Sequence, residues 1–153
     1  MQVFDYNPET GVFTRKLKQT GIKQGSVSGS LSTQGYLVTS VDGKLYSCHR
    51  FAWLYVTGNW PDYQIDHING CRSDNRIANL RDLKKEINIQ NQRRAQKSNK
   101  STQVLGTFKN GKKFAARIAH NGKKLYLGTF TTLEEASAAY LAAKRLLHSG
   151  CTI

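Results

Sequence analysis

The most informative stretch of the sequence is Gln64-Ile65-Asp66-His67-Ile68-Asn69-Gly70. It places a carboxylate beside an imidazole at the end of a short extended segment, directly before a turn that contains glycine. Two asparagines follow, Asn79 and Asn88, which lie 12 and 21 residues after His67. An imidazole with a pKa of about 6.5 accepts a proton near neutral pH, and carboxylate and amide oxygens suit Mg²⁺. These residue types are therefore chemically suited to a general base and to the ligands of a divalent cation.

The residues around this stretch predict short strands joined by tight turns. A cluster of turn residues predicts a β-hairpin over 4–14, and a second hairpin is expected over 36–46. The second prediction rests on Asp42-Gly43, a pair that suits a type I′ turn. The other expected elements are a helix over 48–57 that Gly58 ends, extended pieces over 61–83, and a helix from 84 to about 94.

The C-terminal third has the clearest local signals. Asn-Gly pairs at 110–111 and 121–122 predict the turns of a three-stranded antiparallel sheet. A capping box from Thr132 to Glu135 predicts the start of a helix that carries an apolar stripe. The expected fold class is therefore α+β. Alternation predicts Phe114, Ala116 and Ile118 toward that helix, and Lys113, Ala115, Arg117 and Ala119 on the outer face of the sheet.

The chain is strongly basic. Its 153 residues include 23 Lys+Arg against 10 Asp+Glu, so the formal net charge is +13. Such an excess favours a polyanionic partner, most often nucleic acid. The segment 61–91 is neutral and holds half of the carboxylates, which suits a cation site, although helix caps and surface ion pairs are the simpler role for most of them. The basic run 92–102 lacks large apolar side chains and is predicted to be a linker.

Several classes of protein are not supported. No stretch reaches the roughly 18 to 20 apolar residues of a membrane span, and the N-terminus lacks the features of a secretory signal, so we expect a cytoplasmic location. If a phage encodes the chain, that location is the cytoplasm of the host. The cysteines are odd in number and form no Cys-x-x-Cys pair, so neither a disulfide framework nor a structural zinc is expected.

The motif and its surroundings resemble the HNH endonuclease family, in the variant whose last histidine is replaced by asparagine. A lone Asp-His pair would be a weak signal, but several residues recur at the spacing of the family. The residues that carry the resemblance are Asp66-His67 with the following Ile-Asn-Gly, His49-Arg50, Asp74-Asn75-Arg76, Asn79-Leu80 and Asn88.

This resemblance implies a ββα-metal core at about 60–91, within a nuclease domain of residues 1–91. One Mg²⁺ or Mn²⁺ per active site is implied. By position, Asp66 and Asn88 would be the metal ligands, His67 the general base, and Asn79 the residue that holds the loop and orients His67. The role of His49, in packing or in catalysis, stays open.

The segment from Val104 to His148 resembles an AP2 DNA-binding domain, especially in the runs 111–118 and 126–130. The resemblance implies a domain over 103–153 that lays its sheet in the major groove of double-stranded DNA. Leu105 and Phe108 stand where the plant members carry base-reading arginines, so no sequence preference transfers. The residues expected to contact DNA are Arg50, Arg76, Arg81, Arg93, Arg94, Lys97, Lys113, Arg117, Lys124 and Tyr126.

Together these features predict a DNA endonuclease of the phage or mobile-element homing type that nicks double-stranded DNA. No membrane, small-molecule cofactor or dimer is predicted. Two alternatives remain: a non-catalytic DNA-binding regulator on a nuclease-derived scaffold, and a protein that binds or cleaves RNA. A single metal site cuts one strand at a time, so a double-strand break would need a dimer or a second binding event.

Overall fold

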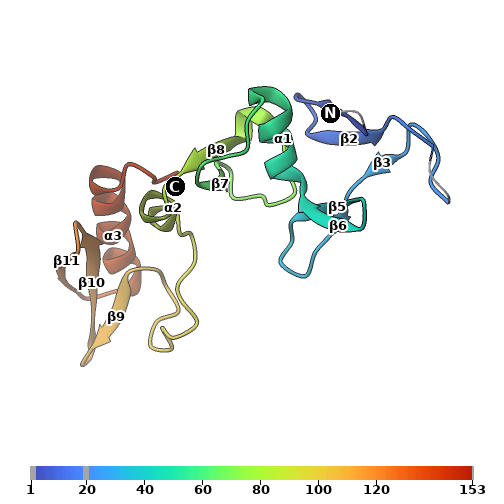
Figure 1. Ribbon diagram of the computed structural model, residues 1–153. Coiled ribbons are helices and arrows are strands. Elements are labelled where there is room, and N and C mark those ends of the chain that lie inside the picture. Colours follow the sequence, from blue (N-terminus) through green and yellow to red (C-terminus); the bar gives the residue numbers. More distant parts are fainter. Residues whose placement is uncertain (1–2, 19–20, 153) are drawn as a thin grey trace. The chain divides into compact units, whose positions relative to one another are not determined.

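Short strands and a few helices build the chain, as the turn signals predict (Figure 1). The computed structural model describes residues 3–18 and 21–152 and has a mixed α+β architecture with small antiparallel sheets. The strands are β1 (Phe4–Asn7), β2 (Val12–Arg15), β3 (Val27–Ser28), β4 (Ser30–Leu31), β5 (Leu37–Val41), β6 (Lys44–Ser47), β7 (Gln64–His67), β8 (Leu80–Leu83), β9 (Thr107–Asn110), β10 (Lys113–His120) and β11 (Lys123–Phe130). The helices are α1 (Cys48–Thr57), the 3₁₀ helix η1 (Ile77–Asn79), α2 (Lys85–Gln90) and α3 (Leu133–Leu147).

Both predicted N-terminal hairpins are confirmed. The strands β1 and β2 pair around a turn in which Oδ1 of Asn7 accepts hydrogen bonds from the backbone N of Glu9 and Thr10, at 2.9 and 3.1 Å. The strands β5 and β6 pair around Asp42 and Gly43, whose φ angles of 49° and 76° are those of a type I′ turn. Strand β3 extends the first sheet, and β4 extends the second.

Aromatic side chains form the core between the first hairpin and α1, which ends at Gly58 as predicted. Phe4 and Phe13 are almost fully buried, and their rings meet edge to face at 6.1 Å. The Tyr6 hydroxyl points out of this core and donates a hydrogen bond to the backbone O of Asn75, at 2.7 Å. The core thereby fixes the segment that precedes η1.

Gly11 brings the same hairpin against that segment. Its φ is +72°, and a Cβ at this position would lie 2.5 Å from the backbone N of Arg76. A second contact lies close by, because the backbone N of Ile77 donates to the O of Pro8, at 3.3 Å. The hairpin and the approach to η1 are therefore packed backbone to backbone, which requires glycine.

The Asp66-His67 motif lies on a two-stranded antiparallel hairpin made of β7 and β8. The register pairs Asp66 with Arg81 and His67 with Leu80. Ile65 and Leu80 are buried in the aromatic core and hold the hairpin against it. The extended pieces predicted over 61–83 are thus present, while the ββα-metal arrangement itself stays a prediction.

The chain divides into two compact units between Lys84 and Lys85, earlier than the predicted domain end at residue 91. Helix α2 is shorter than predicted, and it packs with the C-terminal residues of the second unit. The backbone N of Gly150 donates to Oε1 of Gln90, at 3.3 Å, and a Cβ at Gly150 would lie 2.4 Å from the O of Ile87. The functional domains over 1–91 and 103–153 stay predictions.

Residues 92–102, which are predicted to be a linker, are held by hydrogen bonds to other parts of the second unit. The buried Lys144 of α3 donates its Nζ hydrogen bond to the backbone O of Gln92. Nη2 of Arg93 donates to Oγ1 of Thr152, at 2.7 Å. Backbone and side-chain hydrogen bonds thus hold a segment that has no large apolar side chain to bury.

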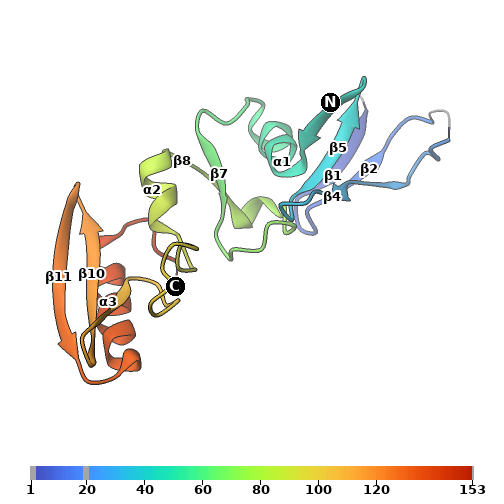
Figure 2. The same cartoon turned by 90° about the horizontal axis from the view of Figure 1, so that it is seen from below.

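The second unit confirms the predicted sheet and helix. The sheet has the order β11-β10-β9, and α3 begins at the predicted capping box, in which Thr132 and Glu135 exchange hydrogen bonds. Ala116 and Ile118 are buried against Tyr140 of α3, so the helix lies along one face of the sheet (Figure 2). The small side chains of α3 allow this close packing.

Ala115 departs from the predicted alternation because it is fully buried although it lies on the outer face. Its cross-strand neighbour is Phe108, and the guanidinium of Arg117 lies 4.9 Å from the Phe108 ring. These larger side chains cover the alanine. Arg117 itself is exposed, as predicted.

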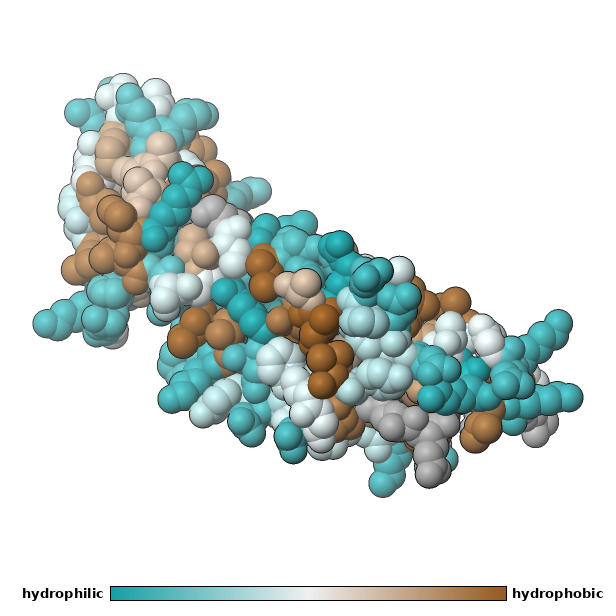
Figure 3. Space-filling model, turned by 90° about the horizontal axis from the view of Figure 1, so that it is seen from above, coloured by the Kyte–Doolittle hydropathy of each residue, from teal (hydrophilic) through white to brown (hydrophobic). Residues whose placement is uncertain are grey.

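Hydrophilic side chains dominate the face of the molecule in Figure 3, with smaller apolar areas among them. Several large apolar side chains are nevertheless exposed, including Leu31 and Leu45 on the second sheet. Across residues 3–18 and 21–152, none of the helices has the length and apolar character needed to cross a membrane.

Candidate active site

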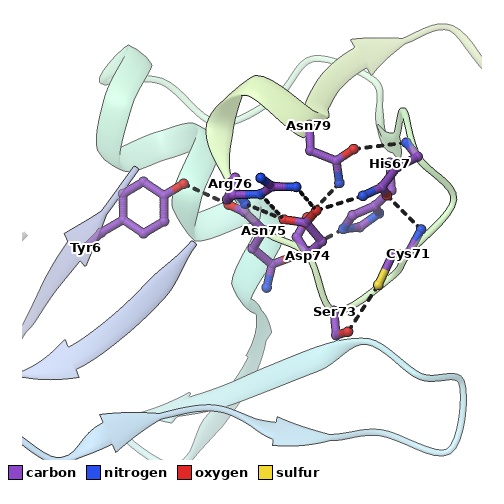
Figure 4. A network of polar contacts seen from close by, with 9 residues as sticks. Tyr6, His67, Cys71, Ser73, Asp74, Asn75, Arg76 and Asn79 are labelled. Atoms are coloured by element: carbon purple, nitrogen blue, oxygen red, sulfur yellow. Dashed lines mark hydrogen bonds and ion pairs between the residues drawn. The ribbon is translucent and has the colours of Figure 1, made fainter. Parts of the chain in front are cut away.

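His67 is the buried centre of the candidate site. Its side chain, at the end of β7, is only 4% exposed. Nε2 of the ring lies 3.2 Å from Oδ1 of Asn75, which is also buried (Figure 4). An amide oxygen only accepts hydrogen bonds, so this contact favours the tautomer with the proton on Nε2 and leaves Nδ1 as the basic nitrogen.

Two further rings surround the imidazole. The ring of His49, from the first turn of α1, meets that of His67 at 5.3 Å in a T-shaped arrangement. Tyr36, just before β5, lies 5.9 Å from His67 and 5.1 Å from His49. Residues from two separate segments therefore pack against the base.

This enclosure sets the protonation state of both histidines. Burial lowers the pKa of His67 below its usual 6.5, and it outweighs the opposing effects of the Asn75 hydrogen bond and of the Asp66 charge. Burial, reinforced by the neighbouring His67 and Arg50, lowers the pKa of His49 from 6.5 to about 4. Both rings are therefore neutral at pH 7, which is the form that can accept a proton.

Asn79 holds the loop that follows His67. Its Oδ1 accepts a hydrogen bond from the backbone N of Asn69, at 2.9 Å, and its Nδ2 donates to the backbone O of Asp74, at 2.8 Å. The backbone O of Asn79 accepts from the N of Ile68, at 2.9 Å. One buried side chain thus ties both ends of the loop 68–74 together (Figure 4). This geometry is what a residue that orients His67 needs.

Asp66 is next to His67 on β7 but has a different partner. Nε and Nη2 of Arg81 both donate to its Oδ2, at 2.9 and 2.7 Å. The pair is partly buried, with 11% of the Asp66 side chain and 24% of the Arg81 side chain exposed. Arg81, which is predicted to contact DNA, therefore forms an ion pair with Asp66, the predicted metal ligand.

Arg76 is likewise paired with a carboxylate. Its guanidinium makes two hydrogen bonds to Asp74, at 2.8 and 2.6 Å, and this pairing lowers the pKa of Asp74 to about 2. Arg50 lies over the ring of Trp60, at 5.8 Å. Because the charges of Arg76 and Arg81 are offset within the protein, any contact of theirs with phosphate is weaker than that of an unpaired arginine.

The other predicted site residues lie in the second unit. Asn88 is in α2, which belongs to the second unit, whereas Asp66 belongs to the first, and its role as a metal ligand stays a prediction. Lys113, Arg117, Lys124 and Tyr126 are exposed on β10 and β11, where the Tyr126 hydroxyl meets Oγ1 of Thr129. Arg93, Arg94 and Lys97 lie on the anchored segment 92–102.

Two residues of the site were not predicted to act there. Asn75 is the hydrogen-bond partner of His67, and its place in the run Asp74-Asn75-Arg76 was the only signal in the sequence. The sequence predicts only a place in a hairpin strand for Tyr36. Nδ2 of Asn75 and Nδ1 of His49 are buried and have no hydrogen-bond partner within the described residues. Most buried polar atoms in proteins have a hydrogen-bond partner, so these two atoms are exceptions.

The donor chemistry of the site suits a hard cation. Within the described residues, no three His, Cys, Asp or Glu side chains gather into a group that could hold a metal ion. Mg²⁺ does not need such a cage, because it is commonly held by one or two carboxylates together with water and phosphate oxygens. The carboxylate oxygens of Asp66 and the amide oxygen of Asn88 are donors of this chemical type, so the chemistry of these residues suits Mg²⁺ or Mn²⁺.

Comparison with known proteins adds one finding. Neither the curated proteins nor the solved structures contain a significant match to the chain. The model of one protein family does match, and the matched part runs from β6 through the His67 hairpin into α2. Residues 46–90 match the family described as HNH endonuclease, which supports a nuclease that acts on DNA.

Proposed function

We propose that the chain is a metal-dependent endonuclease that hydrolyses phosphodiester bonds in double-stranded DNA, one strand at a time. The observation that carries the proposal is the buried, neutral His67, which Asn75 holds by Nε2 at 3.2 Å on the hairpin that the HNH family match covers. A basic unit that follows the nuclease unit along the chain suits the homing type found in phages and mobile elements.

His67 acts as the general base in this proposal. Its Nδ1 takes a proton from the attacking water, and the imidazolium that forms stays in place because Asn75 accepts from Nε2. Asn79 acts through the loop it holds and is a positioning residue. His49 and Tyr36 limit the motion of the ring and keep bulk water away from one side of it.

Asp66 and Asn88 would hold one Mg²⁺ or Mn²⁺, whose charge favours attack on the scissile phosphate and departure of the 3′ oxygen. Arg81 keeps the Asp66 carboxylate in place through Oδ2. By resemblance to the HNH family, the products end in 5′-phosphate and 3′-hydroxyl.

The outer face of the second unit's sheet is proposed to hold the duplex, as in AP2 domains. Arg117 and Tyr126 are cross-strand neighbours there, and Lys113 and Lys124 flank them. Lysines attract phosphate without regard to sequence, whereas arginine can contact bases in the major groove. The face is therefore suited to hold DNA with little sequence preference.

One observation favours the alternative of a non-catalytic DNA-binding regulator. The guanidinium of Arg81 already supplies a positive charge at Asp66, as an arginine that replaced a lost metal would. Such a protein would bind DNA in EDTA as well as in Mg²⁺ and would not cut it.

The experiment that separates the two functions follows the conversion of supercoiled plasmid to open-circular product. Wild type should nick the plasmid in Mg²⁺ or Mn²⁺ but not in EDTA, and His67→Ala should not nick it. His120→Ala is the matched control, because it makes the same chemical change in the second unit, and it should nick like wild type. If wild type leaves the plasmid intact in both metals over a range of salt concentrations, the nuclease proposal is wrong.

A further inference from the structure

A basic groove lies between the segment 93–105 and α3 in the second unit. Its volume is about 740 Å³. The positively charged residues that line it are Arg93, Arg94, Lys97, Lys100 and Arg145, and no carboxylate lines it. Apolar side chains of Val104, Leu105 and Leu141 complete the lining. A wall of cations with apolar side chains among them matches a chain of phosphates joined by sugars.

Three of these cations are available to a ligand. The side chains of Arg94, Lys97 and Lys100 are exposed, and none of them makes a hydrogen bond or an ion pair within the described part of the chain. Arg76 and Arg81 in the first unit, by contrast, are paired with carboxylates. The charge of the groove is therefore not offset locally.

The segment that carries these cations is held in shape. Nδ2 of Asn99 lies within hydrogen-bond distance of the backbone O of Val104 and of Thr107, at 2.9 and 3.1 Å. Lys144 fixes the start of the segment through the backbone O of Gln92. A fixed segment loses less conformational entropy on binding than a free linker does. Its cations are thus partly pre-organised.

The groove is separate from the outer face of the sheet. Ser137, Leu141 and Arg145 of α3 line the groove, and α3 packs on the face of β10 opposite to Arg117 (Figure 2). A straight duplex that lies on the outer face cannot also lie in the groove. The second unit therefore presents two basic surfaces on different sides.

We propose that this groove binds the phosphodiester backbone of duplex DNA, independently of the outer face of the sheet. The proposal rests on the proposed action of the chain on DNA. It gives the second unit two contacts with DNA, to a bent duplex or to two segments of it. RNA offers the same phosphates, but the groove lacks exposed aromatic side chains on which unpaired bases could stack.

The test measures binding of a fluorescent short duplex over a range of salt concentrations, in EDTA so that no cleavage occurs. The test variant is Arg94→Gln/Lys97→Gln/Lys100→Gln. The matched control is Lys18→Gln/Lys23→Gln/Lys44→Gln, which removes the same charge from exposed positions of the first unit. Loss of three phosphate contacts should reduce the slope of log K against log salt by up to about 2.7, and the affinity by on the order of 100-fold at about 0.15 M salt.

Three results would overturn the proposal. The first is an unchanged slope in the groove variant, and the second is an equal fall in the control variant, which would show a general effect of net charge. The third is tighter binding of single-stranded or duplex RNA of the same length than of duplex DNA. Nicking of plasmid by wild type is measured in parallel, so a failure of the proposed nuclease activity is seen separately from a failure of the groove.

Discussion

Acidification should destabilise the first unit through His49. This ring is 9% exposed, and its pKa is about 4 in the folded protein against 6.5 in an unfolded chain. Between these two values the unfolded chain binds a proton that the folded protein does not, so the free energy of unfolding falls as the pH falls. The stabilisation is complete above about pH 6.5 and is lost progressively down to about pH 4.

The magnitude follows from the size of the shift. At about 1.36 kcal/mol per pKa unit, the full loss is about 3.4 kcal/mol, and about 2.5 kcal/mol of it is reached at about pH 4.5. His67 adds to the loss in the same direction, because its pKa is lowered too. Asp74, with a pKa of about 2, takes up its proton only below this range.

The assay is urea unfolding at pH 7.5 and 4.5, followed by tryptophan fluorescence. Both tryptophans, Trp53 and Trp60, lie in the first unit, so the signal reports on that unit alone. We compare wild type with His49→Gln, which cannot titrate, and with His148→Gln, which makes the same change in the second unit. His49→Gln should lose much less free energy than the other two proteins. Equal losses in wild type and His49→Gln would refute the reasoning.

Three further predictions concern other contacts. Gly11→Ala should destabilise the first unit by about 1–3 kcal/mol more than Gly25→Ala. Both glycines have positive φ, but only a Cβ at Gly11 would meet backbone atoms, at 2.5 Å. Equal stability of the two variants in unfolding followed by tryptophan fluorescence would contradict this prediction. Asn75→Asp should move the acidic limb of the pH–rate profile for nicking to higher pH, because a carboxylate that accepts from Nε2 raises the pKa of His67. An unmoved limb would show that residue 75 does not influence the pKa of His67. Asn99→Ala should lower the free energy of unfolding of the second unit by about 1–3 kcal/mol. The loss should appear in unfolding followed by circular dichroism, with no change in the transition followed by tryptophan fluorescence. An unchanged dichroism transition would show that Asn99 does not hold the segment 92–102.

Elements whose signals are local could be predicted from the sequence. The turn at Asp42-Gly43 and the capping box from Thr132 to Glu135 depend on backbone angles and hydrogen bonds within a few residues. The position of His67 at the end of a strand, before a turn with Gly70, is of the same kind. Such features need little information from the rest of the chain.

Contacts between distant residues could not be predicted in this way. Tyr6 and Asn75 are 69 residues apart in the sequence, and nothing local to either indicates their hydrogen bond. The same holds for the ion pair between Arg81 and Asp66, which depends on the β7–β8 register that places the two residues opposite each other. The hydrogen bond that holds the start of residues 92–102 could not be predicted from composition either, because Lys144 lies 52 residues away from Gln92.

The central claim is that His67 is the general base of a metal-dependent nuclease. Its most direct test is the single-turnover rate at which enzyme in excess converts supercoiled plasmid to open-circular product in Mg²⁺ at neutral pH. We predict that His67→Ala is slower than wild type by at least about 100-fold, the usual contribution of a general base, while binding the plasmid equally well in EDTA. A His67→Ala protein that nicks at the wild-type rate would contradict the claim.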